Sequence, residues 1–240
     1  MCGRFTQRFS WRELHELLDL VGPAVNLAPR YNVAPGQQVA TVRSEDDGQR
    51  LAMMRWGLIP SWAKEPNIGY RLINARLETA RTKPSFRSAW RSRRCLIPAD
   101  GFYEWTGEKK ARQPWLIGMK EGGVFCFAGL WERWCVPAGL ELTGSLAELG
   151  AGDALETCTI LTTAANADVS PVHHRMPVIL PPEAFGSWLA GDEVPPQSWP
   201  AGAMTLHPVS PWVNKATNDD PRCVEPAARP ASNAHQDSWF

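Results

Sequence analysis

The sequence has no apolar run long enough to cross a membrane. Its longest mostly apolar stretch covers residues 124–131, whereas a membrane-spanning helix needs about 20 such residues. The first residues also lack the charged segment followed by an apolar segment that marks a secretory signal. From the sequence we therefore expect a cytoplasmic protein without a membrane partner.

Spacings typical of structural metal sites are absent as well. The chain contains six cysteines and no Cys-x-x-Cys pair, and closely spaced cysteines or histidines usually mark a zinc site. We expect neither a metal nor an organic cofactor. In a reducing compartment the thiols should stay free, and Cys95, Cys126 and Cys158 lie in apolar runs that predict burial.

The chain has no net charge, but its positive and negative residues are unevenly distributed along the sequence. The chain has 25 Lys+Arg and 25 Asp+Glu, but residues 1–115 contain 19 and 11 of these, which leaves 25 − 19 = 6 and 25 − 11 = 14 for residues 116–240. A basic region rich in tryptophan is typical of proteins that bind single-stranded nucleic acid, because rings stack on bases and guanidinium groups pair with phosphates. The same composition also fits a tryptophan-rich core with a basic rim. Composition does not decide between these readings.

Hydrophobic periodicity predicts short helices and several strands. Ser10 and Glu13 form a capping-box pattern before leucines at helical spacing, and Gly22 followed by proline should end that helix. Asn74 fits the N-cap of a short helix through Arg81, and further helices are expected over residues 85–91 and 182–189. Strands are expected over residues 39–43, 51–56, 95–98, 102–105, 115–119, 124–131, 157–163 and 204–209.

These elements predict one α+β domain around a mixed, largely antiparallel and partly closed, barrel-like β-sheet with short flanking helices. The four strands between residues 95 and 131 should form an antiparallel meander. The domain is expected to cover residues 1–224, with a surface insertion at about 136–156, where glycines are frequent and periodicity is weak. Residues 225–240 should form a flexible tail. No segment indicates a dimer surface, so we expect a monomer.

The most reactive candidate is Cys2. Removal of Met1 would leave its α-amine and thiol on adjacent carbons, with reference pKa values of about 7.7–8 and about 8.5. Such an aminothiol traps an aldehyde in two steps, because the amine forms an imine and the thiol then closes a five-membered thiazolidine ring. Every chain has a second residue, so Cys2 alone does not identify a function.

Eight segments of the chain form a distinctive ordered set. They are residues 1–5, 30–35, 56–62, 73–79, 94–105, 160–165, 173–177 and 207–210. Together they closely resemble the SRAP family, the SOS-response-associated peptidases or abasic-site-processing proteins, and the resemblance covers roughly residues 2–215. It implies an enzyme that recognises abasic sites in single-stranded DNA. It further implies a reversible thiazolidine crosslink through the N-terminal cysteine, which shields the lesion during the DNA damage response.

The resemblance implies catalytic roles for Cys2 and three other residues. Glu104 matches the family glutamate, which would move protons while the sugar ring opens to its aldehyde. His173 matches the histidine that relays protons during imine formation and ring closure, whereas His174 should be peripheral. Asn74 matches the asparagine that orients the reacting groups, a role compatible with an N-cap position. Without the resemblance, Glu104 would be read as a solvent-facing strand residue.

Further residues are candidates for DNA contacts. Arginines suit phosphates because of their bidentate geometry, tryptophans suit stacking on bases, and a proline suits a wedge at a duplex junction. The candidates are Arg4, Arg76 and Arg175 for phosphates, Trp62 and Trp105 for stacking, Pro35 for the wedge, and Thr162 for a hydrogen bond near the site. For Trp62, packing in the core is an almost equal alternative.

Three other functions stay open at the level of sequence. N-terminal-nucleophile amidohydrolases also begin Met-Cys-Gly and use a free amine beside a thiol. Cys2, His173 and Asn74 together resemble the Cys-His-Asn arrangement of a cysteine peptidase, for which removal of Met1 by the protein itself would be one cleavage. The third alternative is a DNA-binding module in which Cys2 has no chemical role.

Overall fold

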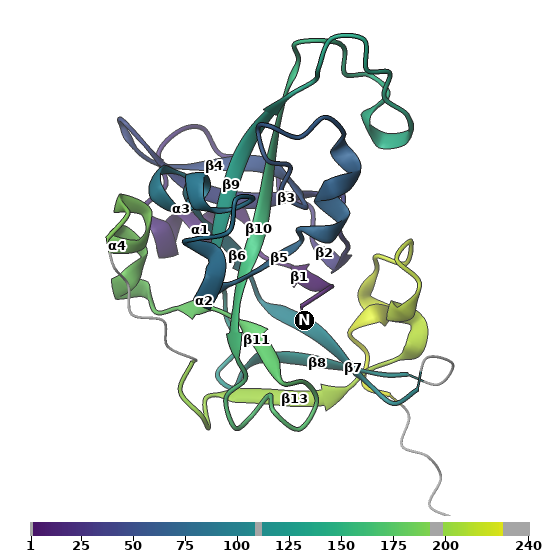
Figure 1. Ribbon diagram of the computed structural model, residues 1–240. Coiled ribbons are helices and arrows are strands. Elements are labelled where there is room, and N and C mark those ends of the chain that lie inside the picture. Colours follow the sequence, from purple (N-terminus) through teal and green to yellow (C-terminus); the bar gives the residue numbers. More distant parts are fainter. Residues whose placement is uncertain (1, 109–111, 193–198, 228–240) are drawn as a thin grey trace, which may run out of the picture.

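Two β-sheets with short helices around them make up the protein, as a computed structural model shows for residues 2–108, 112–192 and 199–227 (Figure 1). The strands are β1 Phe5–Gln7, β2 Arg30–Val33, β3 Gln38–Glu45, β4 Gly48–Trp56, β5 Asn74–Arg76, β6 Arg94–Ala99, β7 Gly101–Thr106, β8 Gln113–Met119, β9 Phe125–Cys135, β10 Ala154–Ala164, β11 Arg175–Pro177, β12 Ile179–Leu180 and β13 Met204–Pro208. The α-helices are α1 Trp11–Leu18, α2 Leu77–Ala80, α3 Arg87–Ser92 and α4 Phe185–Ala190. The 3₁₀-helices are η1 Pro66–Arg71, η2 Gly144–Leu146, η3 Pro182–Ala184, η4 Pro211–Asn214 and η5 Pro221–Cys223.

The larger sheet closes on itself. Strands β10, β4, β3, β6 and β9 pair in that order, and β9 pairs again with β10, so these five strands form a barrel. Strand β10 pairs in parallel with β4 and β5, while the other pairings are antiparallel. The second sheet is antiparallel, in the order β13-β8-β7-β1-β2. The predicted mixed, largely antiparallel and partly closed sheet in a single α+β domain is confirmed.

The first helix begins as its sequence predicts and ends earlier. The Ser10 hydroxyl accepts the Glu13 N–H, and the Glu13 carboxylate accepts the Ser10 N–H at 2.7 Å, which completes the capping box. The helix ends at Leu18 because Asp19 adopts a left-handed conformation and Leu20 then pairs with Gln49 at the start of β4. None of the helices in the described residues is long and apolar enough to span a bilayer.

The prediction that Asn74 caps a helix is wrong. Asn74 begins strand β5, which lies parallel to β10 with Asn74 opposite Ile160, and helix α2 starts three residues later at Leu77. The local sequence suits a cap, but residues 74–76 pair with β10. This pairing gives their backbone groups hydrogen bonds that they would lack at the start of a helix. Because β5 is extended, the Asn74 side chain is positioned by the sheet.

The predicted meander is also wrong, because β6 and β7 are consecutive but belong to different sheets. Strand β6 pairs with β3 and β9, whereas β7 pairs with β8 and β1. The chain changes sheet at Asp100, whose carboxylate pairs with Arg8 at 2.5 Å. The next residue must be small: a Cβ at Gly101 would lie 2.9 Å from the Leu116 side chain and 3.1 Å from that of Thr6. This close approach lets β7 run beside β1.

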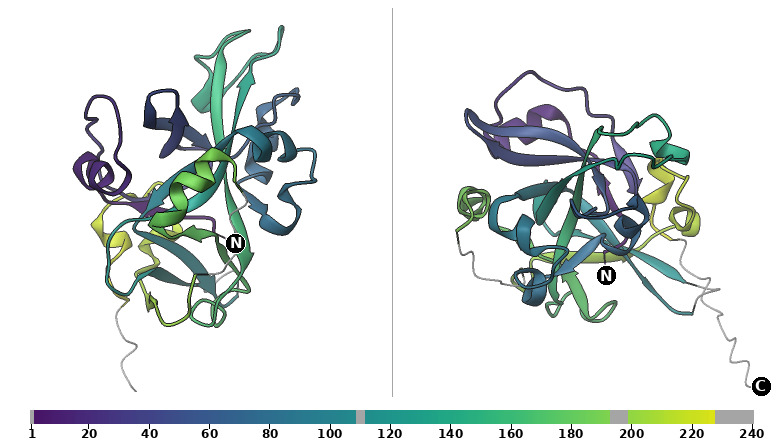
Figure 2. Two further views of the ribbon diagram at one scale, coloured as in Figure 1. Left: turned by 90° about the vertical axis from the view of Figure 1, so that its left-hand side faces the viewer. Right: turned by 45° about the horizontal axis from the view of Figure 1, so that its top comes forward.

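Strands β9 and β10 continue beyond the barrel as a long hairpin, which projects at the top of Figure 1 and of the left view in Figure 2. Residues 154–156 of the predicted insertion belong to β10. At the other end, Glu225 and Ala227 of the predicted tail hydrogen-bond to Ser210 and Pro208, both at 2.9 Å. The rest of that predicted tail, residues 228–240, lies outside the described residues.

Candidate active site

The four predicted catalytic residues come together in one region. Figure 1 shows β1, β5, β7 and β11 near the N-terminus. Cys2 precedes β1, Asn74 begins β5, Glu104 lies on β7, and His173 lies in the loop between β10 and β11. The Tyr103 N–H donates to the Arg4 carbonyl at 2.9 Å, which holds β7 against the N-terminal segment. Because β10 pairs with both β5 and β11, it carries Asn74 and the His173 loop together.

Cys2 is fully buried, and its backbone is fixed by Asn74. The Asn74 amide Nδ2 donates to the Cys2 carbonyl at 2.8 Å, and the Cys2 thiol lies 3.7 Å from the Arg4 carbonyl. Burial raises the pKa of the Cys2 thiol, and the negative charge of Glu104 raises it further. The thiol is therefore protonated at neutral pH.

The other end of the Asn74 amide has no partner in the described part of the chain. Its Oδ1 is buried without a hydrogen bond, which ordinarily costs about 1–3 kcal/mol. Strand β5 is held here by the Trp56 indole, which donates to the Ile73 carbonyl at 2.9 Å. A buried acceptor beside Cys2 is therefore available to a ligand hydroxyl or amine.

Glu104 and His173 are coupled electrostatically. Glu104 is 4% exposed, and its charge raises the pKa of His173, while burial of the ring has the larger, opposite effect, so that the pKa lies below its ordinary value. His173 Nδ1 lies 2.9 Å from the Arg175 backbone nitrogen and 3.0 Å from the Arg175 carbonyl oxygen, so the backbone of Arg175 orients the ring. The exposed His174 ring stacks on His173 at 4.4 Å, consistent with a peripheral place.

Two of the residues predicted to contact DNA, Arg175 and Thr162, bond to each other within the protein. The Arg175 guanidinium binds the Glu78 carboxylate through two bonds of 2.6 and 2.9 Å and donates to the Thr162 carbonyl at 2.6 Å. The Thr162 side chain is fully buried. These bonds anchor the residue whose backbone orients His173. Sequence reasoning missed Glu78, although it lies within the segment 73–79 that carries the family resemblance.

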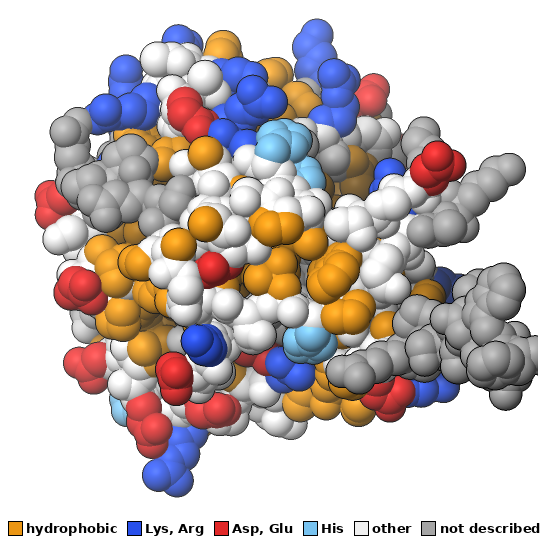
Figure 3. Space-filling model, turned by 90° about the horizontal axis from the view of Figure 1, so that it is seen from below, with side chains coloured by type: hydrophobic (Ala, Val, Ile, Leu, Met, Phe, Trp, Pro, Cys, Tyr) orange, Lys and Arg blue, Asp and Glu red, His pale blue; other side chains and the backbone are white. Residues whose placement is uncertain are grey.

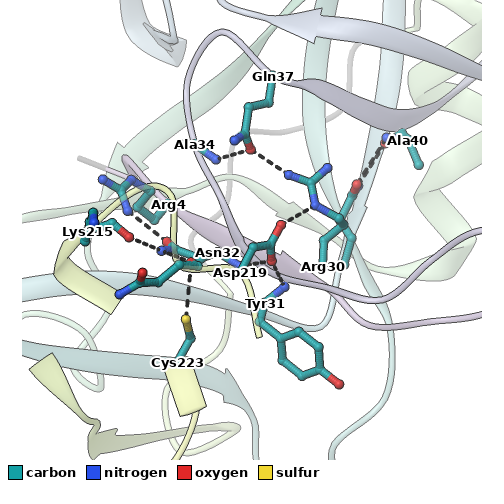
Figure 4. Close-up of polar contacts among 12 residues, drawn as sticks. Arg4, Arg30, Tyr31, Asn32, Ala34, Gln37, Ala40, Lys215, Asp219 and Cys223 are labelled. Atoms are coloured by element: carbon teal, nitrogen blue, oxygen red, sulfur yellow. Dashed lines mark hydrogen bonds and ion pairs between the residues drawn. The ribbon is translucent and has the colours of Figure 1, made fainter. Parts of the chain in front are cut away.

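Arg4 also bonds within the protein. Its Nη1 donates to Asn32 Oδ1 at 2.8 Å and to the Val213 carbonyl at 3.2 Å (Figure 4). The fully buried Asn32 amide in turn lies within 3.1 Å of the carbonyls of Val213, Lys215 and Asn218.

The Asp219 carboxylate completes this network. It accepts the backbone N–H groups of Tyr31 and Asn32 at 2.5 and 3.0 Å and pairs with Arg30 (Figure 4). The network fastens residues 211–219 beside the N-terminal strand. Sequence reasoning missed Asp219, because no local pattern links it to residues 30–32.

The remaining candidates differ in exposure. Trp62 is 59% exposed, so the alternative that it packs in the core is wrong. The Arg76 side chain is exposed and forms no hydrogen bond or ion pair with another described residue, and its charge lowers the pKa of Glu78. Trp105 is half-buried and donates to Asn214 Oδ1 at 2.7 Å, and Pro35 is half-buried in the loop between β2 and β3.

Exposed basic side chains are frequent near α2 and α3. They are Lys64, Arg71, Arg76, Arg81, Lys83, Arg87 and Arg91. Seen from below, lysines and arginines gather along the upper edge of the molecule beside histidine side chains, and acidic side chains gather toward the lower left (Figure 3). Most tryptophans of the basic half lie inside or partly inside the protein, and Trp56 is 1% exposed. Within the described residues, no three His, Cys, Asp or Glu side chains gather as metal ligands would.

Comparisons with known proteins show the family and the fold. The model of the SOS response associated peptidase (SRAP) family matches residues 1–216. The abasic site processing protein YoqW of Bacillus subtilis is 40% identical over 235 residues, which cover 94% of this chain and 99% of the relative. The abasic site processing protein HMCES of Gallus gallus is 33% identical over 234 residues, covering 82% of this chain and 66% of the relative. A crystal structure of a Bacteroides thetaiotaomicron protein shares the fold, with a TM-score of 0.79, 24% identity, and coverage of 95% of this chain and 100% of that one.

Proposed function

The chain belongs to the SRAP family, and from that premise we propose that it processes abasic sites in DNA. It recognises the lesion in single-stranded DNA and forms a reversible thiazolidine crosslink between Cys2, freed of Met1, and the ring-opened sugar aldehyde. The crosslink shields the lesion during the DNA damage response. The names of the relatives in Bacillus subtilis and Gallus gallus support the class of substrate.

One arrangement carries this proposal. Asn74 holds the Cys2 backbone through a 2.8 Å hydrogen bond, and the charge of Glu104 acts on both the Cys2 thiol and His173. Three side chains from separate strands and loops thus surround one residue at the chain terminus. An aminothiol placed among an acid/base pair and an amide is what aldehyde capture requires.

The chemistry follows from the protonation states. Glu104 moves a proton during opening of the deoxyribose, which exposes the C1′ aldehyde. The Cys2 amine then adds to that carbon, and water leaves as the imine forms, with His173 relaying protons. The thiol finally adds to the imine carbon, and its proton passes to the nitrogen. A thiol with a raised pKa suits this order, because the amine reacts first and the neutral thiol closes the ring.

The same protonation state speaks against a cysteine peptidase. Catalytic cysteines of peptidases have a lowered pKa, because the thiolate is the nucleophile, whereas burial and Glu104 raise the pKa of Cys2. The amide of Asn74 is bonded to Cys2, while the asparagine of a Cys-His-Asn triad would orient the histidine. Under this proposal, the one peptide bond that the protein could still cleave is the bond that joins its own Met1 to Cys2.

The proposed DNA path uses two exposed candidates, Arg76 and Trp62, and the half-buried Pro35. Arg76 contacts a backbone phosphate, Trp62 stacks on a base, and Pro35 forms the wedge at a duplex junction. Arg4 and Arg175 are further candidates for phosphates, Trp105 for stacking and Thr162 for a hydrogen bond near the site. All four also bond to other parts of the protein. The protein acts as a cytoplasmic monomer at the nucleoid and needs no cofactor.

A denaturing gel tests the crosslink. We mix mature protein lacking Met1 with a single-stranded oligonucleotide that carries one abasic site and expect a heat-stable shifted band. The band should be absent for Cys2→Ala and for protein that retains Met1. Cys2→Ser is the matched control: it keeps the amine and loses the thiol, so it should give a band only after borohydride reduction of the imine.

Two results would contradict the proposal. Hydrolysis of glutamine without a shifted band would identify an amidohydrolase. Salt-sensitive binding that never becomes covalent would identify a passive DNA-binding module.

A further inference from the structure

A cleft of about 430 Å³ lies away from Cys2, between η1 and the loop that joins β9 to β10. Its walls include Arg55, Tyr70, Glu65, Glu141 and Ser145. None of these residues takes part in the chemistry described above. The combination of an arginine, an aromatic ring and carboxylates in one cleft suggests a ligand with both acceptor and donor groups.

Arg55 lies at this cleft without a carboxylate partner among the described residues. It is 7% exposed, and its guanidinium donates to three neutral groups, the Gly36 carbonyl, the Ser145 hydroxyl at 3.2 Å and the Tyr70 hydroxyl at 3.0 Å. A guanidinium has five N–H donors, so these bonds leave two for a ligand. A buried charge is costly unless it is paired, and acceptor atoms of a ligand would supply that pairing.

Gly36 has no side chain, and this leaves the space in which Arg55 and Tyr70 lie together. Gly36 has a φ of +85°, and a Cβ there would lie 3.0 Å from Arg55 Nη2 and 3.1 Å from the Tyr70 ring. A side chain at this position would therefore push Arg55 and Tyr70 apart. Gly36 follows Pro35, so the cleft adjoins the proposed wedge.

Tyr70 offers a stacking surface beside the arginine. The residue is 57% exposed and lines the cleft. The Arg55 guanidinium bonds to the phenol hydroxyl and lies over one face of the ring, with its central carbon 5.5 Å from the ring centroid. A base stacked on the ring face would bring its edge toward the guanidinium. Aromatic rings bind unpaired bases in this way.

The carboxylates decide the class of ligand. Glu65 and Glu141 are both exposed and both line the cleft with Arg55. Two carboxylates would repel a phosphate, whereas they accept hydrogen bonds from a base that carries donors. Guanine combines the O6 and N7 acceptors that arginine reads with the N1 and N2 donors that a carboxylate accepts. Adenine has a donor in place of O6 and so fits less well.

We propose that this cleft binds an unpaired guanine base, with Tyr70 stacked on the base, Arg55 donating to O6 and N7, and Glu65 or Glu141 accepting from N1 and N2. The inference rests on the proposed function only in taking the base to belong to a single DNA strand. The cleft then gives the protein a preference for guanine near the lesion, on the side of Pro35.

Lesion-free DNA tests this preference without any crosslink. Fluorescence anisotropy should show that an oligothymidine with one guanine binds about tenfold more tightly than oligothymidine alone, the size expected for a good bidentate contact. Inosine, which lacks the N2 amine, and 7-deazaguanine, which lacks N7, should each lose most of that gain. Guanosine monophosphate should compete for the cleft, and inorganic phosphate should not.

Three exposed residues of the cleft provide variants that should fold. Tyr70→Ala should remove most of the guanine preference, and so should a chain that carries both Glu65→Gln and Glu141→Gln. Glu148→Gln changes an exposed glutamate on the same loop outside the cleft and should keep it. Crosslinking at an abasic site, measured in parallel with saturating DNA, should persist in all three variants.

The outcomes separate the two proposals. Equal affinity for guanine, inosine, 7-deazaguanine and thymine strands would overturn the guanine cleft, as would equal competition by phosphate. Guanosine monophosphate could bind while the affinity for a DNA strand does not depend on guanine. That result would overturn the assignment of the cleft to DNA. A guanine preference in a protein that forms no crosslink would support the cleft and refute the proposed function alone.

Discussion

A single carboxylate acts on two groups of the site with different results. The charge of Glu104 adds to burial at the Cys2 thiol, where both raise the pKa, and opposes burial at His173, where burial has the larger effect. Glu104 thus favours the protonated thiol and keeps the pKa of His173 closer to its ordinary value than burial alone would. The effect on His173 favours proton transfer by this ring near pH 7.

Replacing Glu104 by glutamine should therefore shift the titration of His173 to lower pH. The substitution removes the negative charge that raises the pKa of the ring, and NMR spectra of the imidazole nitrogens against pH measure the midpoint. His207 is the internal control, because burial and Arg8 lower its pKa and Glu104 does not contribute. An unchanged His173 midpoint would show that Glu104 does not act on this ring.

The same shift has a consequence for stability. Because the pKa of His173 lies below its ordinary value of 6.5, the unfolded chain binds the proton first, and stability falls as pH drops from 6.5 through the folded pKa. In Glu104→Gln the folded pKa of His173 should be lower still, so the loss of stability should continue to a lower pH. Urea unfolding at several pH values would show this.

For single residues, the sequence predicts which residues form the site better than it predicts which partners they bind. Cys2, Asn74, Glu104 and His173 follow from the resemblance, and the structure brings them together. Arg175 looks like a phosphate ligand, yet it binds Glu78, because the two meet only when β10 lies between β5 and β11. No periodicity in the sequence encodes that pairing. Arg55 was missed for the same reason, since its environment comes from three distant segments.

The hairpin of β9 and β10 connects the barrel to the loop that bears Trp62. Trp134 on β9 is fully buried, and its indole donates to the Ala63 carbonyl at 2.7 Å, one residue after the exposed Trp62. Two tryptophans close to each other thus have opposite roles, one holding the loop and the other free to contact a ligand.

Substituting each tryptophan by alanine should separate these roles. Trp134→Ala should lower the free energy of unfolding by about 3–5 kcal/mol, the usual cost of removing a buried tryptophan. Trp62→Ala should leave stability nearly unchanged and weaken binding to single-stranded DNA. Urea unfolding and fluorescence anisotropy measure the two effects, and a large loss of stability in Trp62→Ala would contradict the assignment.

Elements with a strong local pattern were predictable, and those defined by a distant partner were not. The strands over residues 39–43, 51–56 and 157–163 show apolar runs and occur within β3, β4 and β10. Strands β1, β5 and β11 have three residues each and exist through their partners. The meander failed because a change of sheet at Asp100 occupies one residue and resembles an ordinary turn.

Across the whole molecule, the two oppositely charged halves of the sequence share one barrel. Strands β3, β4 and β6 come from the basic half and β9 and β10 from the acidic half. The C-terminal segment then returns to the N-terminal strands, where Asp219 binds the backbone of Tyr31 and Asn32. This contact lies beyond the residues matched by the family model, which ends at 216.

Asp219→Ala should destabilise the protein by about 2 kcal/mol or more, because it leaves two backbone N–H groups without their charged acceptor. The neighbouring Asp220→Ala is the control: this half-buried residue caps η5 and binds Arg222 and Trp212 near the surface, so its loss should have a smaller effect. Thermal unfolding of both variants gives the comparison. Similar melting temperatures would show that the network around Asn32 does not need Asp219.

This return of the C-terminal segment has a consequence for how the protein is made. A ribosome releases Cys2 first, but Arg4 and Asn32 gain their partners at Val213, Lys215 and Asn218 only when nearly the whole chain has emerged. The nascent chain therefore exposes its terminus before the surroundings of that terminus exist. Maturation of the N-terminus can proceed while it is still accessible, and the finished pocket then closes around it.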